Sequence, residues 1–151
     1  MGLDMYLTAR RYLSDYEEQE RKISEAIAKL ELGNMNFRIK EVSCDVGYWR
    51  KANAIHKWFV HNVQGGIDNC KPYHVSKKDL EKLLEVCNFV TKNKKDVAAI
   101  MEKLPPQSGF FFGGTEVDEY YFEDIKETKK IIKAALKLDD SEWSLYYQSS
   151  W

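Results

Sequence analysis

The stretch GYWRKANAIHKWFV, residues 47 to 60, gathers side chains that could bind a ligand or transfer a proton. On a helical projection its apolar residues form a stripe, and Trp49, Asn53 and His56 lie at the edge of that stripe. Such half-buried positions bring an indole, an amide and an imidazole against a ligand or a neighbouring backbone. Histidine and tryptophan at a core edge are also common packing residues, so a purely structural role is the competing interpretation.

Two cations adjoin this edge. Arg50 and Lys51 fall in the first turn of the helix that we predict over residues 48 to 63. Positive charge there opposes the helix dipole. A bound phosphate would reverse that effect, because free N–H groups and two cations would then converge on it. A solvated first turn is the alternative. The pattern therefore makes Arg50 and Lys51 candidate anion-binding residues.

A second stretch, QSGFFFGGTEVDEYYFED, runs from residue 107 to residue 124. Its glycines permit close backbone approach, and Gln107, Ser108 and Phe110 offer polar and aromatic groups beside them. The acidic helix start that follows fits neither a Walker A loop nor a Rossmann fingerprint. Asp124 falls within the predicted apolar stripe of that helix. Its carboxyl therefore needs a partner, such as a cation or the histidine of the first stretch, or a raised pKa.

The third stretch is YYQSSW, residues 146 to 151. In a strand, Tyr146, Gln148 and Ser150 share one face, while Tyr147 and Trp151 take the core-facing side. Hydroxyls, an amide and an aromatic ring on a sheet suit a planar, polar ligand that stacks and forms hydrogen bonds. A tyrosine-rich face that packs under a helix is the alternative.

The sequence offers few groups for catalysis. It contains no HExxH, nucleophile-elbow or paired-cysteine motif. His56 and His61 have a spacing that does not share one helix face for a metal. We therefore expect no metal site and no cofactor. If the protein is an enzyme, His56 and Asp124 are the acid–base pair that remains.

Periodicity and capping predict the elements that must position these groups. Alternating apolar residues predict strands, and apolar residues at helical spacing between capping residues and glycines predict helices. The expected strands cover residues 2–8, 37–46, 107–114 and 144–151. The expected helices begin at Ser14, near Tyr48, at Ser76, after residues 92–95 and at Thr115, and the first of them ends at Gly33. This order predicts an α+β fold, with a small mixed or antiparallel sheet of about four strands covered by four to five helices.

Length and composition set limits on the class of protein. The 151 residues suit one domain over residues 1–151, and the 23 basic and 24 acidic residues give no overall electrostatic case for nucleic acid, although a local basic patch stays open. Cys44, Cys70 and Cys87 indicate neither a disulfide framework nor a zinc site. We find no signal-peptide pattern and no apolar stretch near the roughly 20 residues of a membrane span. We therefore expect a cytoplasmic protein without a membrane partner.

Two longer segments carry a resemblance, DVGYWRKANAIHKWFVHNVQ and QSGFFFGGTEVDEYYFEDI, together with GLDMYL near the start and YYQSSW at the end. Over nearly its full length the chain resembles a family of small, mostly uncharacterised bacteriophage and prophage proteins. The resemblance implies action in the cytoplasm of a bacterial host. Small phage proteins are often inhibitors or sponges directed against host defence, and several such sponges sequester nucleotide signals, so by analogy the resemblance implies an anti-defence role.

The leading hypothesis is a soluble binding protein, such as a sponge, for a nucleotide-like ligand. One alternative is an enzyme acting on a nucleotide or nucleic acid, and another is a protein inhibitor of a host factor with an exposed aromatic patch. Oligomerisation stays open, because sponge pockets often lie between subunits. The predicted ligand-binding residues are Trp49, Arg50, Lys51, Asn53, His56, Gln107, Ser108, Phe110, Tyr146, Gln148 and Ser150.

Overall fold

A four-stranded antiparallel sheet organises the fold. The computed structural model describes residues 2–30 and 38–151. The strand order is β2-β1-β4-β3, and every neighbouring pair is antiparallel. The strands are β1 (Asp4–Tyr12), β2 (Glu41–Arg50), β3 (Tyr73–Val75) and β4 (Ser144–Ser150). The predicted α+β class is confirmed, and the sheet is antiparallel rather than mixed.

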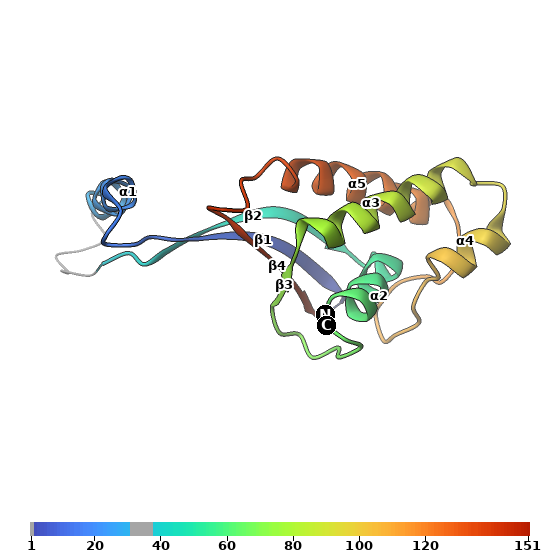
Figure 1. The fold of residues 1–151 in the computed structure, drawn as a ribbon. Coiled ribbons are helices and arrows are strands. Elements are labelled where there is room, and N and C mark those ends of the chain that lie inside the picture. The colour runs from blue at the N-terminus through green and yellow to red at the C-terminus, as the bar shows by residue number, and fades with distance from the viewer. Residues whose placement is uncertain (1, 31–37) are drawn as a thin grey trace.

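Five helices accompany this sheet in the described part of the chain. Figure 1 shows α3 and α5 running side by side along the sheet, α2 near the two termini, and α1 at the far end of the long β1–β2 hairpin. The helices are α1 (Glu18–Ala28), α2 (Asn53–Asn62), α3 (Lys77–Lys92), α4 (Val97–Lys103) and α5 (Glu119–Ala135). Within residues 2–30 and 38–151, none of them combines the length and apolar character of a membrane span.

The core lies between the inner face of the sheet and the helices. Strand β1 contributes Met5, Leu7 and Ala9, which are buried as their alternation predicts. The ring of Tyr147 on β4 stacks on Phe59 of α2, with ring centroids 4.0 Å apart. Burying each large apolar side chain stabilises the fold by about 1.5–3 kcal/mol. The opposite face of the sheet is open, and it carries the polar and tyrosine side chains that alternate with the buried residues along β1 and β4.

The second strand runs further along the chain than predicted. Residues 48 to 50 were expected to begin a helix, but they form the end of β2, where Trp49 pairs with Met5 and Arg50 pairs with Asp4. Pairing with β1 satisfies the backbone of these residues, so they need no helical hydrogen bonds. Lys51 then turns the chain with φ of 61°, and α2 begins only at Asn53. The predicted N-terminal boundary of this helix was wrong.

Residues 107–114 form a loop, whereas a short buried strand was predicted. The chain turns at Phe110 and Phe111, and Phe111 has φ of 64°, which an extended strand does not allow. Phe112 is the buried phenylalanine of this loop, and Phe110 is 85% exposed. Conversely, β3 forms in a segment for which no strand was predicted.

Two of the three predicted helix caps differ from the structure. The Ser76 hydroxyl accepts from the backbone N–H of Asp79 in a complete capping box, as predicted. Asp118 caps α5 instead of Thr115, because its carboxylate accepts from the backbone N–H of Tyr121 at 3.0 Å. Helix α1 begins at Glu18 without a side-chain cap, rather than at Ser14.

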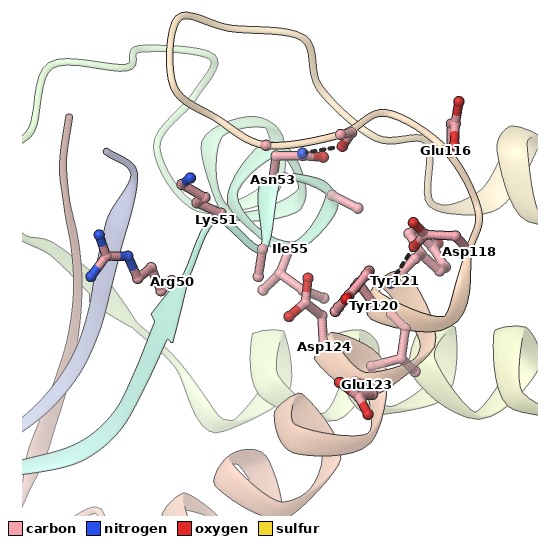
Figure 2. A pocket seen from close by; sticks show the side chains of 15 residues that line it. Arg50, Lys51, Asn53, Ile55, Glu116, Asp118, Tyr120, Tyr121, Glu123 and Asp124 are labelled. Carbon is pink, nitrogen blue, oxygen red and sulfur yellow. Dashed lines mark hydrogen bonds between the residues drawn. The ribbon is translucent and has the colours of Figure 1, made fainter. Parts of the chain in front are cut away.

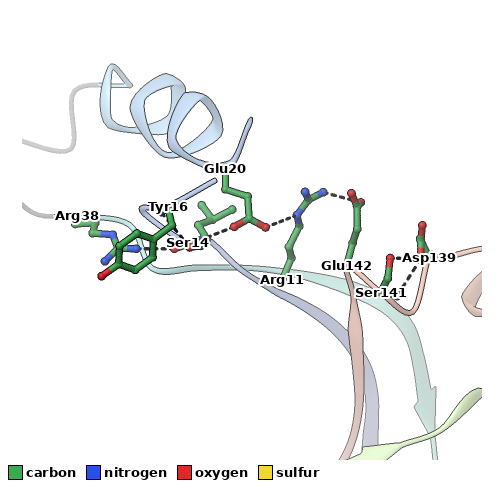
Figure 3. Close-up of polar contacts among 9 residues, drawn as sticks. Arg11, Ser14, Tyr16, Glu20, Arg38, Asp139, Ser141 and Glu142 are labelled. Carbon is green, nitrogen blue, oxygen red and sulfur yellow. Dashed lines mark hydrogen bonds and ion pairs between the residues drawn. The ribbon is translucent and has the colours of Figure 1, made fainter. Parts of the chain in front are cut away.

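Ion pairs hold the outer end of the β1–β2 hairpin. Figure 3 shows Arg11 between the carboxylates of Glu142, at 2.8 Å, and Glu20, at 3.8 Å. Helix α1 itself contains no buried residue. Its predicted end at Gly33, and the start of the second strand at Phe37, lie outside the described residues.

Candidate functional site

A pocket of about 460 Å³ lies where the end of β2 meets the starts of α2 and α5 (Figure 2). Cations, carboxylates and aromatic rings line it together, so it offers polar groups that could orient a ligand. The lining side chains with polar or charged groups are Arg50, Lys51, Asn53, Glu116, Asp118, Tyr120, Tyr121, Glu123 and Asp124. Three of these, Arg50, Lys51 and Asn53, were predicted from the sequence as ligand-binding residues.

The charges of the pocket are segregated. Figure 2 shows Arg50 and Lys51 on the side of the sheet, and the carboxylates of Asp118, Glu123 and Asp124 on the side of α5. The guanidinium of Arg50 is directed toward the strands and away from α5, so Arg50 forms the outer edge of the pocket. A ligand in this pocket would therefore meet positive charge at one end and negative charge at the other.

The start of α2 adds to the positive end. Its N-cap is Ala52, which has no side chain that can accept a hydrogen bond. The first N–H groups of a helix have no partner inside the helix, and they attract an anion together with the helix dipole. Ala54 and Ile55, in the first turn, line the pocket. Lys51 thus lies just before α2 rather than within its first turn, and the anion site remains a prediction.

Backbone conformation is unusual beside the positive end. Lys51 and Phe111 have φ of 61° and 64°, values that non-glycine residues rarely adopt. A side chain on Gly113 would meet the Cβ of Lys51 at 3.3 Å, and Gly113 has φ of 94°. Strained residues of this kind cluster at ligand sites because the surrounding structure must hold them in place.

Asn53 builds the pocket rather than facing its interior. The side chain is buried, and its amide nitrogen donates to the carbonyls of Phe112, at 3.1 Å, and Gly114, at 2.8 Å. Its amide oxygen accepts from the backbone N–H of Gln107 at 3.0 Å. These three bonds fix residues 107–114 against α2. Asn53 lines the pocket, but both of its amide N–H groups are occupied by this backbone, so its role as a ligand-binding residue stays a prediction.

Asp124 is the titratable group with the largest consequence for the pocket. Burial, together with repulsion from the neighbouring carboxylates of Glu123 and Asp118, raises the pKa of this carboxyl to about 6. The sequence predicted either a partner or a raised pKa, and the raised pKa is confirmed. The Asp124 carboxyl can therefore accept a hydrogen bond or donate one near neutral pH, depending on its protonation.

His56 lies outside this pocket, in a buried network of its own. Its Nε2 is 2.9 Å from the Asp68 carboxylate, and its Nδ1 is 2.8 Å from the Tyr147 hydroxyl. Because a carboxylate only accepts, Nε2 donates to Asp68 and Nδ1 of the neutral ring accepts from Tyr147. Asp68 also accepts from the indole N–H of Trp151 at 3.1 Å. The proposed pairing of His56 with Asp124 is therefore corrected, since both ring nitrogens have other partners.

Trp49 is likewise structural. Its side chain is 3% exposed, and its indole N–H donates to the Thr128 hydroxyl at 2.9 Å. Thr128 in turn donates to the backbone carbonyl of Asp124 at 2.7 Å. The prediction that Trp49 contacts ligand is corrected, because burial under α5 leaves no ring face for stacking. Through Thr128, Trp49 instead supports the backbone that carries Asp124.

The other predicted loop residues do not line the pocket. Gln107 contributes its backbone N–H to Asn53, whereas Ser108 and Phe110 are exposed on the loop. The turn at Phe110 and Phe111 directs this part of the loop to solvent. The pocket instead receives Gly113 and Gly114 from the end of the same loop.

The predicted residues of the last strand lie on the open face of the sheet. Tyr146 and Gln148 are half-buried there and Ser150 is exposed, so the predicted common face is present but belongs to a separate surface. The Arg10 guanidinium lies 4.6 Å from the centre of the Tyr146 ring. The side-chain amide of Gln148 donates to the carbonyl of Cys70 at 2.9 Å. Trp151 was expected on the core side, but it is 53% exposed.

Sequence reasoning missed the acidic wall of the pocket and the partners of His56. The sequence shows the acidic residues at the start of α5, but stabilisation of the helix dipole explains them without a ligand site. Tyr120, which is 76% exposed at the pocket, was not singled out. Asp68 lies in a loop without a pattern, so no sequence signal marked it.

Among the described residues, no group of three or more histidine, cysteine, aspartate or glutamate side chains is placed to hold a metal ion. No protein-family model, curated protein or solved structure matches the chain.

Proposed function

We propose that this protein binds a nucleotide-like small molecule in the pocket between the starts of α2 and α5. The observation that carries the proposal is the segregation of charge, with Lys51 and the uncapped start of α2 on one side and Asp118 and Asp124 on the other. A nucleotide has the complementary arrangement. Its phosphate is an anion, and the edge of its base offers N–H donors that carboxylates can accept.

The position of each ligand group follows from this arrangement. The phosphate would accept from the N–H groups of Ala54 and Ile55 and from the Lys51 ammonium, since the Asn53 N–H already donates to the Lys51 carbonyl at 2.8 Å. The base would direct its donor edge toward Asp124, whose raised pKa permits either hydrogen-bond role. The exposed ring of Tyr120 would pack against the base at the mouth of the pocket.

We propose sequestration rather than turnover as the outcome of binding. His56, the histidine considered for acid–base catalysis, is held by Asp68 and Tyr147 away from the pocket. The resemblance to phage and prophage proteins supports a sponge for a nucleotide signal of host defence, acting in the bacterial cytoplasm. The bound molecule would then be recovered unchanged.

Calorimetric titration with a panel of linear and cyclic nucleotides tests this proposal. For any nucleotide that binds wild type, Lys51→Ala should weaken the affinity by roughly tenfold or more, since a charge-assisted hydrogen bond contributes about 1.5–3 kcal/mol. Lys57→Ala is the matched control, because Lys57 lies six residues further along the chain, on α2, but does not line the pocket. Chromatography of the ligand after incubation separates sequestration from turnover. The proposal is wrong if no nucleotide binds at millimolar concentration.

The open face of the sheet favours a second candidate function, inhibition of a host protein. Tyr6 and Tyr48 lie opposite each other on this face, with ring centroids 5.4 Å apart, and they are 37% and 47% exposed. Exposed tyrosines on a flat surface are typical of protein interfaces. In chemical cross-linking to host proteins, Tyr6→Ser with Tyr48→Ser should abolish a specific adduct. Tyr16→Ser is the control, because Tyr16 is 96% exposed and lies outside the sheet.

A further inference from the structure

A basic groove lies between α3 and α5, on a part of the molecule that the proposed nucleotide pocket does not use. The groove has a volume of about 370 Å³. Figure 1 shows α3 and α5 lying side by side; six of the eight lining residues belong to α5, and the other two come from the end of α3 and the residues after it. The lining residues are Thr91, Lys94, Phe122, Ile125, Lys126, Lys129, Lys130 and Lys133. Five of these eight are lysines and none is acidic. We call this surface the lysine groove.

The lysines of α5 follow the spacing of a single helix face. Lys126, Lys129, Lys130 and Lys133 are separated by three or four residues, so their ammonium groups are neighbours. Like charges at this spacing repel one another and destabilise the helix. In a chain with a net charge of −1, such a cluster is a local excess of positive charge. A bound polyanion would remove the repulsion.

Few acids in the described residues neutralise the groove. Lys130 forms an exposed ion pair with Glu127 at 2.7 Å. Lys129 donates to the Thr91 hydroxyl across the groove at 3.4 Å. Exposed ion pairs of this kind are weak, so the ammonium groups stay available to an external anion.

The floor of the groove is apolar. Phe122 is half-buried there, and the Lys94 ammonium lies 5.1 Å from the centre of its ring. An aromatic ring beside cations suits single-stranded nucleic acid, because a base can stack on the ring while the cations contact phosphates. The lysine face from Phe122 to Lys133 is about 16 Å long at the rise of a helix, which is long enough for several nucleotides.

The shape and chemistry of the groove select among polyanions. The lysines lie along one face of α5, so a flexible strand could follow them with successive phosphates. Lysine acts as a point charge on phosphate and does not read base edges as arginine or asparagine does. The expected binding is therefore independent of sequence.

We propose that the lysine groove binds single-stranded nucleic acid, with phosphates on Lys126, Lys129, Lys130 and Lys133 and a base against Phe122. This function is independent of nucleotide binding in the other pocket. The two sites share only Ile125 among their lining residues, so each can be altered separately.

Fluorescence anisotropy with a labelled oligothymidylate tests the groove in the intact protein. The groove variant combines Lys126→Gln, Lys130→Gln and Lys133→Gln, and the control variant combines Lys57→Gln, Lys71→Gln and Lys78→Gln, which removes the same charge outside the groove. The groove variant should bind roughly tenfold or more weakly at low salt. The slope of log affinity against log salt should fall by about 2, since each lost phosphate contact to a single strand contributes about 0.7. The control should stay within about twofold of wild type.

Phe122→Leu tests the stacking contact separately. Because leucine keeps the apolar volume but lacks a ring face, single-strand binding should weaken by roughly fivefold while the salt slope stays unchanged. Circular dichroism confirms that each variant is folded. Absence of wild-type binding at low salt, equal loss in the two triple variants, or duplex binding as tight as single-strand binding would each overturn the proposal. Tighter binding to phosphatidylserine vesicles than to the oligonucleotide would also overturn it.

Discussion

The side-chain amide of Asn53 holds the carbonyl of Gly114 at 2.8 Å and thereby ties the loop before α5 to the start of α2. Both residues line the pocket, and the contact joins segments that are 61 positions apart in the chain. Asn53, which the sequence pattern favours for ligand binding, thus shapes the pocket by holding this loop. The loop reaches its position because a buried amide satisfies its backbone.

Replacing Asn53 should destabilise the protein strongly. In Asn53→Ala, the N–H of Gln107 and the carbonyls of Phe112 and Gly114 lose their partner. Leaving such groups unpaired should lower the free energy of unfolding by about 2–4 kcal/mol, measured by urea denaturation. Asn62→Ala is the control, because Asn62 is an exposed residue of the same helix. A loss below about 1 kcal/mol would show that the clamp does not hold the loop.

Substituting alanine for either of two adjacent glycines should have different effects on the stability of the protein. Gly113 has φ of 94°, and an added Cβ would meet Lys51 at 3.3 Å, whereas nothing lies within 4 Å of a Cβ on Gly114. Gly113→Ala should therefore lower the free energy of unfolding by about 1–3 kcal/mol. Gly114→Ala should leave it unchanged or raise it slightly. Thermal unfolding of the two variants measures the difference, and equal melting temperatures would contradict the described loop conformation.

Asp124 should make stability depend on pH. Because burial raises its pKa from 3.8 to about 6 in the folded protein, the folded state holds this proton at pH values where the unfolded chain has released it. The contribution of Asp124 to stability is therefore greatest below about pH 4 and falls as pH rises through 6. Allowing for solvent screening, the loss is about 1–2 kcal/mol.

The variant Asp124→Asn isolates this effect. It should remove this part of the pH dependence, so it should be more stable than wild type at pH 7 and similar to wild type at pH 4. Urea denaturation at several pH values measures both curves. Parallel curves for the variant and wild type would show that Asp124 titrates normally.

Replacing either of two neighbouring tyrosines on β4 by phenylalanine should change the stability of the protein by different amounts. Tyr147→Phe removes the hydroxyl that His56 Nδ1 accepts from, and leaves that nitrogen buried without this partner. The free energy of unfolding should fall by about 1–3 kcal/mol. Tyr146→Phe is the control on the open face of the sheet and should change stability by less than about 0.5 kcal/mol. Equal effects would mean that the His56 network does not stabilise the fold.

The sequence by itself determined features that depend on near neighbours. The Ser76 and Asp79 capping box and the alternation of Tyr146, Tyr147 and Gln148 appear in the structure as predicted. A capping box spans four residues, and strand alternation follows from the direction of successive side chains. The same short-range logic indicated that Asp124 needs a partner or a raised pKa, because a carboxyl on an apolar helix face is partly buried, and its pKa is raised.

Only the tertiary structure decided which distant groups meet. Trp49 belongs to a strand because β1 pairs with it, and His56 is occupied because Asp68 and Tyr147 reach it from two other segments. Helical periodicity does not predict such contacts, because strand pairing and side-chain partners depend on the packing of elements far apart in the chain. Packing of α3 against α5 likewise joined Lys94 to the lysines of α5 in one groove. The sequence pattern predicted many of the candidate polar residues, and the packing of the helices and sheet decided which of them share a site.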